Sequence, residues 1–291
     1  MALETLELSF DVCDLPTAQH RAGLAGLLVL TESLRRRKMK PLPVIRTGEE
    51  GRIAVRLTQE SLQVLLDDLY DASWEQRSSS KKPLGKSLRK VRTVRVKPKK
   101  KGAAQGTMYT FETIAPKVAF LKTLGMPEPW LKLWREAIWG TLRGIPMTRN
   151  PYEQRLADTP VVEASVIWGE LLKRQQGIDQ GQHRTVKLSS SLFLGAQAVS
   201  AERVPFQDRA DHALLLHFWP VVMGIYVPEI IDRKGQTRFV GYVFAVPDVE
   251  DPESFSPSFL DSLGQLGADP AGYRPRDGAL LPTAPPEWTD R

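Results

Sequence analysis

The residues with the clearest chemical capability are the cations between Lys81 and Lys101. This stretch holds eleven Lys or Arg in twenty-one positions, and no Asp or Glu occurs between Glu75 and Glu112. The formal net charge of the chain is +6, so the remainder sums to 6 − 11 = −5. Charge concentrated in this way predicts a local polyanion, such as nucleic acid, as the partner. The alternative is a solvated, partly disordered loop. The cations are Lys81, Lys82, Lys86, Arg89, Lys90, Arg92, Arg95, Lys97, Lys99, Lys100 and Lys101.

The same stretch has the pattern of a β-hairpin. Arg92 to Lys97 alternates polar and apolar residues, which is the period of a half-buried strand. Gly102 to Gly106 predicts a turn, and Met108 to Phe111 predicts the returning strand. Such a hairpin would carry its cations on one face, where they could meet successive phosphates.

A second group of side chains could read base edges. Residues 143–155, RGIPMTRNPYEQR, form a turn-rich segment with one glycine and two prolines. Arg and Asn side chains make paired hydrogen bonds to guanine and adenine edges. The candidate readers are Arg143, Arg149, Asn150, Tyr152 and Arg155. The alternative is a polar loop between helices that carries these residues for solubility alone.

Side chains that could catalyse a reaction do not form a complete set. Cys13 and His20 could pair as thiol and imidazole, but no third group that would orient them is evident. His212 and His217 stand five positions apart near Asp211, whereas a metal site needs more ligands at regular spacing. Phosphate-binding GxxxxGK[ST] and dinucleotide-binding GxGxxG motifs are absent. The sequence therefore predicts no enzyme, no cofactor and no bound metal.

The helix predicted over 16–37 contains two informative glycines. Glycine in a helix interior costs about 1 kcal/mol relative to alanine. Gly23 and Gly26 therefore suggest that another backbone packs closely against this helix. The elements predicted before the basic stretch are a strand over 6–12, this helix, a strand over 52–57 and a helix capped by Thr58.

The second half of the chain predicts helices followed by strands. Trp130, Trp134 and Ile138 stand four apart, a spacing more typical of a buried helix face than of a base-stacking platform. The predicted elements are helices over 113–142 and 161–174 and strands over 183–188, 214–219, 221–227 and 237–246. From Asp248 onward, seven Pro and four Gly indicate a linker or a loosely packed tail.

These elements predict an α+β fold. It has mixed strands and helices at the N-terminus with the basic β-hairpin, then helices and an antiparallel strand set, and a Pro-rich C-terminal tail. We expect one domain over 1–248, which faces the nucleic acid, and a tail or linker over 249–291.

Neither export nor membrane insertion is predicted. The N-terminus has no basic region followed by an apolar run, so it does not have the pattern of a signal peptide. The most apolar window, residues 213–231, is interrupted by His, Glu and two prolines and predicts strands rather than a membrane span. The single cysteine, Cys13, excludes a disulfide framework within this chain and fits a reducing compartment. The expected location is the cytoplasm.

Four segments in order resemble a known family. Residues 15–26, LPTAQHRAGLAG, are similar to the opening motif of the CRISPR Cascade large subunit in its myxobacterial (MYXAN) type I subfamily. The later segments are 143–155, 194–206 and 217–242. The resemblance implies a non-catalytic subunit of an RNA-guided complex that lies at the 5′ end of the guide RNA (crRNA). Such a subunit inspects the duplex protospacer-adjacent motif (PAM), helps to open the duplex and holds the displaced strand.

The resemblance and the residues suggest the same division of tasks. Base pairing with the guide supplies most of the sequence specificity, so the protein needs phosphate-neutralising cations and a few base readers. Residues 81–101 would supply the cations. Residues 143–155, together with Gln19, His20 and Arg21, are candidate readers. The chain departs from the family in ending before a C-terminal helical bundle, and no individual PAM-reading residue can be matched.

The expected partners are crRNA, target double-stranded DNA and the backbone, handle-binding and small subunits of Cascade. Two alternatives stay open. The chain could be mainly a docking subunit that recruits a nuclease–helicase or transposition factors through its acidic remainder. It could also be a metal-dependent nucleic-acid-processing enzyme that uses His212, His217 and Asp211.

Overall fold

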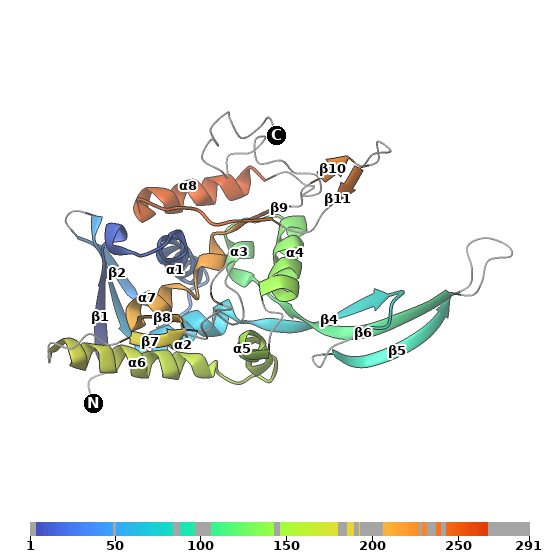
Figure 1. Cartoon of the computed structure of the whole chain (residues 1–291), viewed down its shortest axis with the longest axis horizontal. Coiled ribbons are helices and arrows are strands. Elements are labelled where there is room, and N and C mark those ends of the chain that lie inside the picture. The colour runs from blue at the N-terminus through green and yellow to red at the C-terminus, as the bar shows by residue number, and fades with distance from the viewer. Residues whose placement is uncertain are drawn as a thin grey trace.

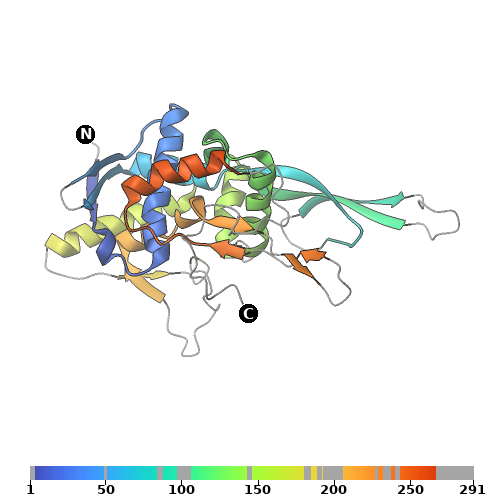
Figure 2. The same cartoon turned by 90° about the horizontal axis from the view of Figure 1, so that it is seen from above.

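The computed structural model describes residues 4–48, 51–83, 88–96, 106–142, 146–179, 185–188, 192, 206–226, 229–231, 237–239 and 243–266. Helices and antiparallel sheets are mixed along the chain, which confirms the α+β prediction. Most elements pack into one body, and a long ribbon of strands projects from one end of it (Figure 1). The view from above shows the same division into body and ribbon (Figure 2).

The chain begins with a small antiparallel sheet of order β1-β3-β2. Its strands are β1 (Thr5–Phe10), β3 (Ile53–Thr58) and β2 (Val44–Thr47). Leu6, Leu8 and Phe10 face the core, as their alternation predicts. Helix α2 (Gln59–Leu69) follows β3 directly through a capping box. There Thr58 Oγ1 accepts from the Ser61 amide at 3.1 Å, and Ser61 Oγ accepts from the Thr58 amide at 2.9 Å.

Helix α1 (Ala18–Arg36) runs through the centre of the body and is buried along most of its length. A Cβ atom at Gly23 would overlap the carbonyl of Leu215, and one at Gly26 would overlap the carbonyl of Phe218. These carbonyls belong to α7 (Ala210–Leu215) and to the turn before the 3-10 helix η5 (Trp219–Val221). The expected close approach of another backbone is therefore confirmed.

The region after the basic stretch differs from the single helix predicted over 113–142. Residues 113–116 complete strand β6, because they pair with β4. The helices are α3 (Ala119–Thr123), α4 (Glu128–Ala137) and the π-helical turn η3 (Ile138–Leu142). Gly125, at φ 98°, and Pro127 separate α3 from α4. The core role predicted for Trp130 and Trp134 is confirmed, with exposures of 5% and 3%.

Helices α5 (Pro146–Leu156) and α6 (Val162–Asp179) follow along the other side of the body (Figure 1). The side of α6 that packs on the body carries Ala164, Trp168 and Leu171, which are all buried. Within the described ranges, no helix combines the length and the apolar character needed to cross a bilayer.

The predicted strand set is only partly correct. Residues 214–219 form the end of α7, a turn and the first residue of η5 rather than a strand. Nearly all of these residues are buried. The segment is therefore apolar at nearly every position, and it shows neither the polar–apolar period of a helix nor that of a strand. The strands are β7 (Thr185–Leu188), β8 (Phe206–Arg209), β9 (Gly224–Tyr226), β10 (Glu229–Ile231), β11 (Thr237–Phe239) and β12 (Val243–Ala245). They form the antiparallel pairs β7–β8, β9–β12 and β10–β11.

The start of the Pro-rich segment is a packed helix. Helix α8 (Pro252–Gly264) begins at Asp251, whose Oδ1 accepts from the amides of Glu253 and Ser254 at 3.0 and 3.3 Å. Phe259 and Leu263 from α8 are 6% and 1% exposed and belong to the core. The helix lies along α1 in both views (Figures 1 and 2). Residues 252–264 therefore form part of the body.

Candidate nucleic-acid interface

The projecting ribbon is an antiparallel sheet of order β4-β6-β5. Its strands are β4 (Ala72–Ser79), β6 (Gly106–Pro116) and β5 (Leu88–Val96). Among the described residues of the ribbon, the buried ones lie at the end nearest the body: Ala72 and residues 113–116. Residues 89–94 of β5 are all exposed. The ribbon thus carries part of the basic stretch away from the core and into solvent (Figure 1).

The predicted phosphate-binding cations fall into three groups. Lys81 and Lys82 are exposed just beyond β4. Arg89, Lys90 and Arg92 are exposed on β5, and Arg95 belongs to the same strand. The other predicted cations lie outside the described residues: Lys86, Lys97, Lys99, Lys100 and Lys101.

A β-bulge changes the direction of side chains on β5. The pairing with β6 shifts register between Arg89 and Arg92, and Lys90 has a left-handed backbone, with φ 51°. Side chains normally alternate between the two faces of a strand, so neighbours such as Arg89 and Lys90 should point apart. The bulge instead lets both cations reach the same carboxylate, that of Glu112 on β6.

Glu112 is held by two ion pairs. Its Oε2 accepts from Arg89 Nε at 2.6 Å, and its Oε1 accepts from Lys90 Nζ at 2.9 Å. The hydrogen bond from Lys90, with that from Arg89, holds the pKa of the Glu112 carboxyl below its usual value despite an opposing effect of burial. The Arg89 guanidinium also lies over the Trp74 ring, 3.8 Å from its centroid, in a cation–π contact.

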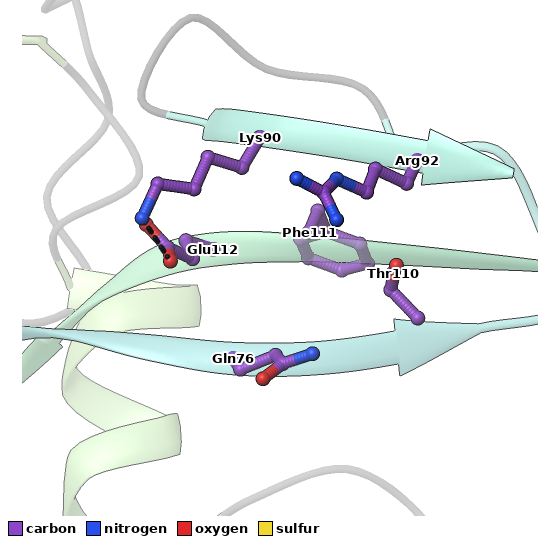
Figure 3. A pocket seen from close by; sticks show the side chains of 6 residues that line it. All are labelled: Gln76, Lys90, Arg92, Thr110, Phe111 and Glu112. Atoms are coloured by element: carbon purple, nitrogen blue, oxygen red, sulfur yellow. Dashed lines mark hydrogen bonds and ion pairs between the residues drawn. The ribbon is translucent and has the colours of Figure 1, made fainter.

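A groove of about 270 Å³ lies beside this ion-pair cluster. Its lining residues come from all three strands of the ribbon: Gln76, Lys90, Arg92, Thr110, Phe111 and Glu112. Figure 3 shows Lys90 bonded to Glu112, with Arg92 directed from β5 toward β6. Among the described residues, Arg92 has no acidic partner, so its charge is available to a ligand.

The predicted base-reading loop over 143–155 is wrong in its secondary structure, because residues 146–156 form helix α5. Proline is readily accommodated at the start of a helix, so Pro146 does not prevent this helix from forming. Tyr152, a predicted base reader, is only 1% exposed, and its ring packs edge-on against Tyr70 and Trp139. Tyr152 therefore belongs to the core.

The other candidates in this segment differ in accessibility. Arg155 Nη1 donates to the Thr159 carbonyl at 3.1 Å and lies 3.8 Å from Asp67, so it is already engaged. Arg149 is half-buried, with a buried Nε that has no partner among the described residues. Asn150 is exposed. Arg143, also predicted to read bases, lies outside the described residues. Asn150 and Arg149 are the candidates that a nucleic acid could reach.

Gln19, His20 and Arg21 join distant segments rather than form an open cluster. Gln19 Nε2 donates to the Leu192 carbonyl at 3.4 Å. Arg21 Nε donates to Asp248 at 2.5 Å, and this bond is the main reason why the pKa of Arg21 is raised. His20 is 1% exposed, so it cannot reach a base edge in this arrangement. The base-reading expectation for His20 is therefore contradicted.

No residue pattern indicates the contact that His20 makes instead. Its Nδ1 bonds Thr17 Oγ1 at 2.8 Å and its Nε2 bonds Asp208 Oδ2 at 2.8 Å. His212 Nδ1 lies 3.3 Å from the other oxygen of Asp208. Asp208 follows His20 by 188 positions, so no local pattern could have paired the two residues.

The residues considered for metal-dependent chemistry have separate structural partners. Asp211 accepts from Arg174 at 2.8 Å and from Arg209 at 2.7 Å. His217 Nδ1 bonds the Tyr70 hydroxyl at 2.8 Å. Within the part of the chain that the structure describes, no three His, Cys, Asp or Glu side chains are arranged to hold a metal ion.

Comparisons with known proteins identify the family. None of the curated proteins compared with the chain matches it. The family model of the type I-B CRISPR Cas8b N-terminal domain matches residues 42–282, which include the whole ribbon and helices α2 to α8. The match confirms the resemblance to a type I CRISPR large subunit but does not confirm the myxobacterial subfamily, whose opening motif at 15–26 lies outside the matched range. The chain belongs to the family of type I-B CRISPR Cas8b N-terminal domains.

Proposed function

We propose that this chain, as the large-subunit domain of a type I-B Cascade complex, binds target DNA through the projecting ribbon and inspects the PAM. The proposal assigns it no catalytic step, because His20, His217 and Asp211, which were considered for chemistry, are engaged in structural contacts. Its partners would be crRNA, whose 5′ end it contacts, and the other Cascade subunits. These assignments rest on the family together with the charge of the ribbon.

The observation that carries the proposal is the placement of cations on the ribbon. Arg89, Lys90 and Arg92 are exposed on a strand that contributes little to the core, so solubility of the body does not require them. A duplex carries one phosphate per about 1.7 Å of axis, and exposed cations spaced along a strand can neutralise several of them. Helix α5, which bears Arg149 and Asn150, packs against β4 and β6. Phosphate contacts and base reading could therefore occur within one footprint.

The salt dependence of DNA binding tests this proposal. If six to eight cations of residues 81–101 meet phosphates, log K should fall with log salt at a slope of about −5 to −7. The combined variant Lys97→Ala, Lys99→Ala, Lys100→Ala and Lys101→Ala should bind more weakly and show a shallower slope. A variant with Lys122→Ala and Lys132→Ala, two exposed cations of the body, is the control and should keep the slope. Equal slopes for wild type and the ribbon variant would mean that the basic stretch is only a solvated loop.

A docking role is the second candidate. Val162 and Val166 are 55% and 59% exposed and lie one turn apart on α6, which leaves a small apolar surface suited to a protein contact. Such a subunit would recruit a nuclease–helicase or transposition factors. Mixing the isolated chain with matched and scrambled PAM duplexes separates the two roles, because a docking subunit has no PAM preference.

A further inference from the structure

Glu112 occupies an unusual place on the ribbon. It is the first acidic residue after Glu75, and two of the ribbon's exposed cations converge on it. Its carboxylate therefore engages two cations that could otherwise meet phosphates. Because the charge of the stretch suits phosphate binding, an internal anion within it requires an explanation.

The backbone is shaped to bring both cations to this carboxylate. Lys90 adopts a left-handed conformation that residues with a Cβ rarely take, and the register of β5 shifts around it. Bulges of this kind redirect side chains and are common beside functional sites. Without the bulge, Lys90 and Arg89 would alternate to opposite faces.

The two ion pairs differ in how firmly they are held. Arg89 stacks on Trp74 as well as bonding Glu112, so two contacts fix it. The Lys90 side chain is 62% exposed, and its only ion pair within the described residues is with Glu112. An exposed ion pair of a flexible lysine is weak, because solvent screens it and holding the side chain costs entropy. Lys90 can therefore leave Glu112 more easily than Arg89 can.

The groove next to Lys90 offers the other groups that a phosphate needs. Arg92 supplies a guanidinium without an acidic partner in the described chain, and Gln76 and Thr110 supply amide and hydroxyl donors. All of them line the same groove as Lys90 (Figure 3). Its volume, about 270 Å³, is below the roughly 300–1,000 Å³ of typical small-molecule sites and suits one sugar–phosphate unit of a chain.

We infer that this groove is a subsite for one backbone phosphodiester, and that Glu112 competes with that phosphate for Lys90 and so limits the affinity of the ribbon for nucleic acid. The inference rests on the proposed DNA binding, and it assigns Glu112 the role of weakening that binding. When the phosphate enters between Lys90 and Arg92, Lys90 exchanges a carboxylate oxygen for a phosphate oxygen, while Arg89 stays on Glu112 and Trp74. Weakened phosphate binding suits a subunit that must release non-target duplex between encounters.

The variant Glu112→Gln tests the inference, with Glu75→Gln as its matched control. Both variants remove one negative charge from the ribbon. Glu75 lies on β4, one position away from the strand position that pairs with Glu112, so it faces the other side of the sheet, where it pairs with Arg77 at 3.4 Å. Affinity for a fluorescein-labelled duplex would be measured from 50 to 300 mM salt, together with a thermal melt. Glu112→Gln should bind about three- to tenfold more tightly at 100 mM salt, with a log–log slope steeper by about 0.9 for the added phosphate contact. Glu75→Gln should change much less in both quantities.

Two outcomes overturn the inference. If Glu112→Gln and Glu75→Gln behave alike, only the total charge matters. If Glu112→Gln binds more weakly at an unchanged melting temperature, Glu112 positions the cations for DNA instead of competing with it.

A second measurement covers the case in which Glu112→Gln is poorly folded. Lys90→Ala alone should cost less affinity than Arg92→Ala, because Lys90 must first leave Glu112; an equal or larger loss for Lys90→Ala contradicts the inference. Wild-type chain with no salt-dependent binding would refute the proposed function itself, whereas wild-type binding without the predicted differences would refute only the role of Glu112.

Discussion

At the scale of single residues, Asp208 has the most demanding environment. Its carboxylate, 15% exposed, accepts hydrogen bonds from His20 and His212 and from the Arg209 amide. Burial alone would raise the pKa of Asp208, but the bonds from the two histidines outweigh burial and hold this pKa well below its usual range. The residue thereby ties the start of α1 to β8 and α7.

We expect Asp208→Asn to lower the free energy of unfolding at pH 7 by about 1.5–3 kcal/mol, the range for hydrogen bonds to a charged group. A depressed carboxyl pKa stabilises the fold above the unfolded value of about 3.9, and the stabilisation is lost as pH falls through the folded pKa. The difference from wild type should therefore shrink as pH falls below about 4. Urea unfolding from pH 3 to 7 checks this, with Asp261→Asn, at an exposed site on α8, as the control.

Single residues also mark where sequence reasoning succeeds and where it ends. The burial of Trp130 and Trp134 could be predicted because they stand four positions apart on one helix and therefore share a face. The pairing of His20 with Asp208 has no such relation, since tertiary folding alone brings α1 beside β8. Glu112 is visible in the sequence as the end of an acid-free run, but its contact with Lys90 depends on a bulge that no residue pattern indicated.

At the scale of elements, α1 can cross α7 and η5 closely because Gly23 and Gly26 have no side chain. We expect Gly23→Ala and Gly26→Ala each to cost about 1–3 kcal/mol or more, because the new methyl group would overlap a backbone carbonyl that can move only with its element. Gly169→Ala in α6 is the matched control. A Cβ there meets nothing within 4 Å, so the better helix propensity of alanine should stabilise the chain by up to about 1 kcal/mol. Chemical denaturation of the three variants distinguishes packing from propensity; destabilisation by Gly169→Ala of the same size would contradict the packing account.

Helix α5 changes how the proposed PAM reading should be tested. Asn150 is exposed on a helix that packs against the ribbon, which gives it a firmer support than a loop would. If α5 reads the PAM, Asn150→Ala or Arg149→Ala should cost about 1–3 kcal/mol on the preferred PAM duplex and much less on a scrambled one. The measurement is affinity for both duplexes, accompanied by a thermal melt. Parallel losses on the two duplexes would exclude base reading by these residues.

The error over α5 has a physical cause. Its sequence is polar, and its two prolines and Asn150 are typical turn formers, so local propensity favoured a loop. The helix is held by a tertiary contact instead, since Tyr152 fills a space between Tyr70 and Trp139. By contrast, strands β1 and β3 of the N-terminal sheet and helix α1 were predictable, because each shows an apolar period that matches its burial.

At the scale of the whole molecule, the ribbon and the body should be separable. Most of β5 and the outer parts of β4 and β6 lie outside the hydrophobic core, which is contained in the body. Ser79 and Tyr109 are paired on β4 and β6, so replacing residues 80–108 by an Asn-Gly turn would join the two strands in register.

We expect this shortened chain to melt close to wild type and to lose at least about tenfold in duplex affinity at 100 mM salt, with a shallower salt slope. Circular dichroism melting and fluorescence anisotropy provide the two readouts. Retained DNA affinity would move the binding surface to the body, and an unfolded product would mean that the ribbon is needed for the core.

The length of the ribbon has a mechanical consequence. The seven residues from Gly106 to Glu112 of β6 extend roughly 23 Å at about 3.3 Å per residue. Among the described residues, the sheet is anchored at the end nearest the body, by buried residues such as Ile114 and by the ion pair of Arg77 with Glu136 on α4. It is therefore a lever arm: a rotation of about 10° at its base sweeps the far end through about 4 Å, close to the ~3.4 Å step between nucleotides on one strand. A pivot at the rim of the body would thus let the same cations follow a duplex by one nucleotide without repacking the interior.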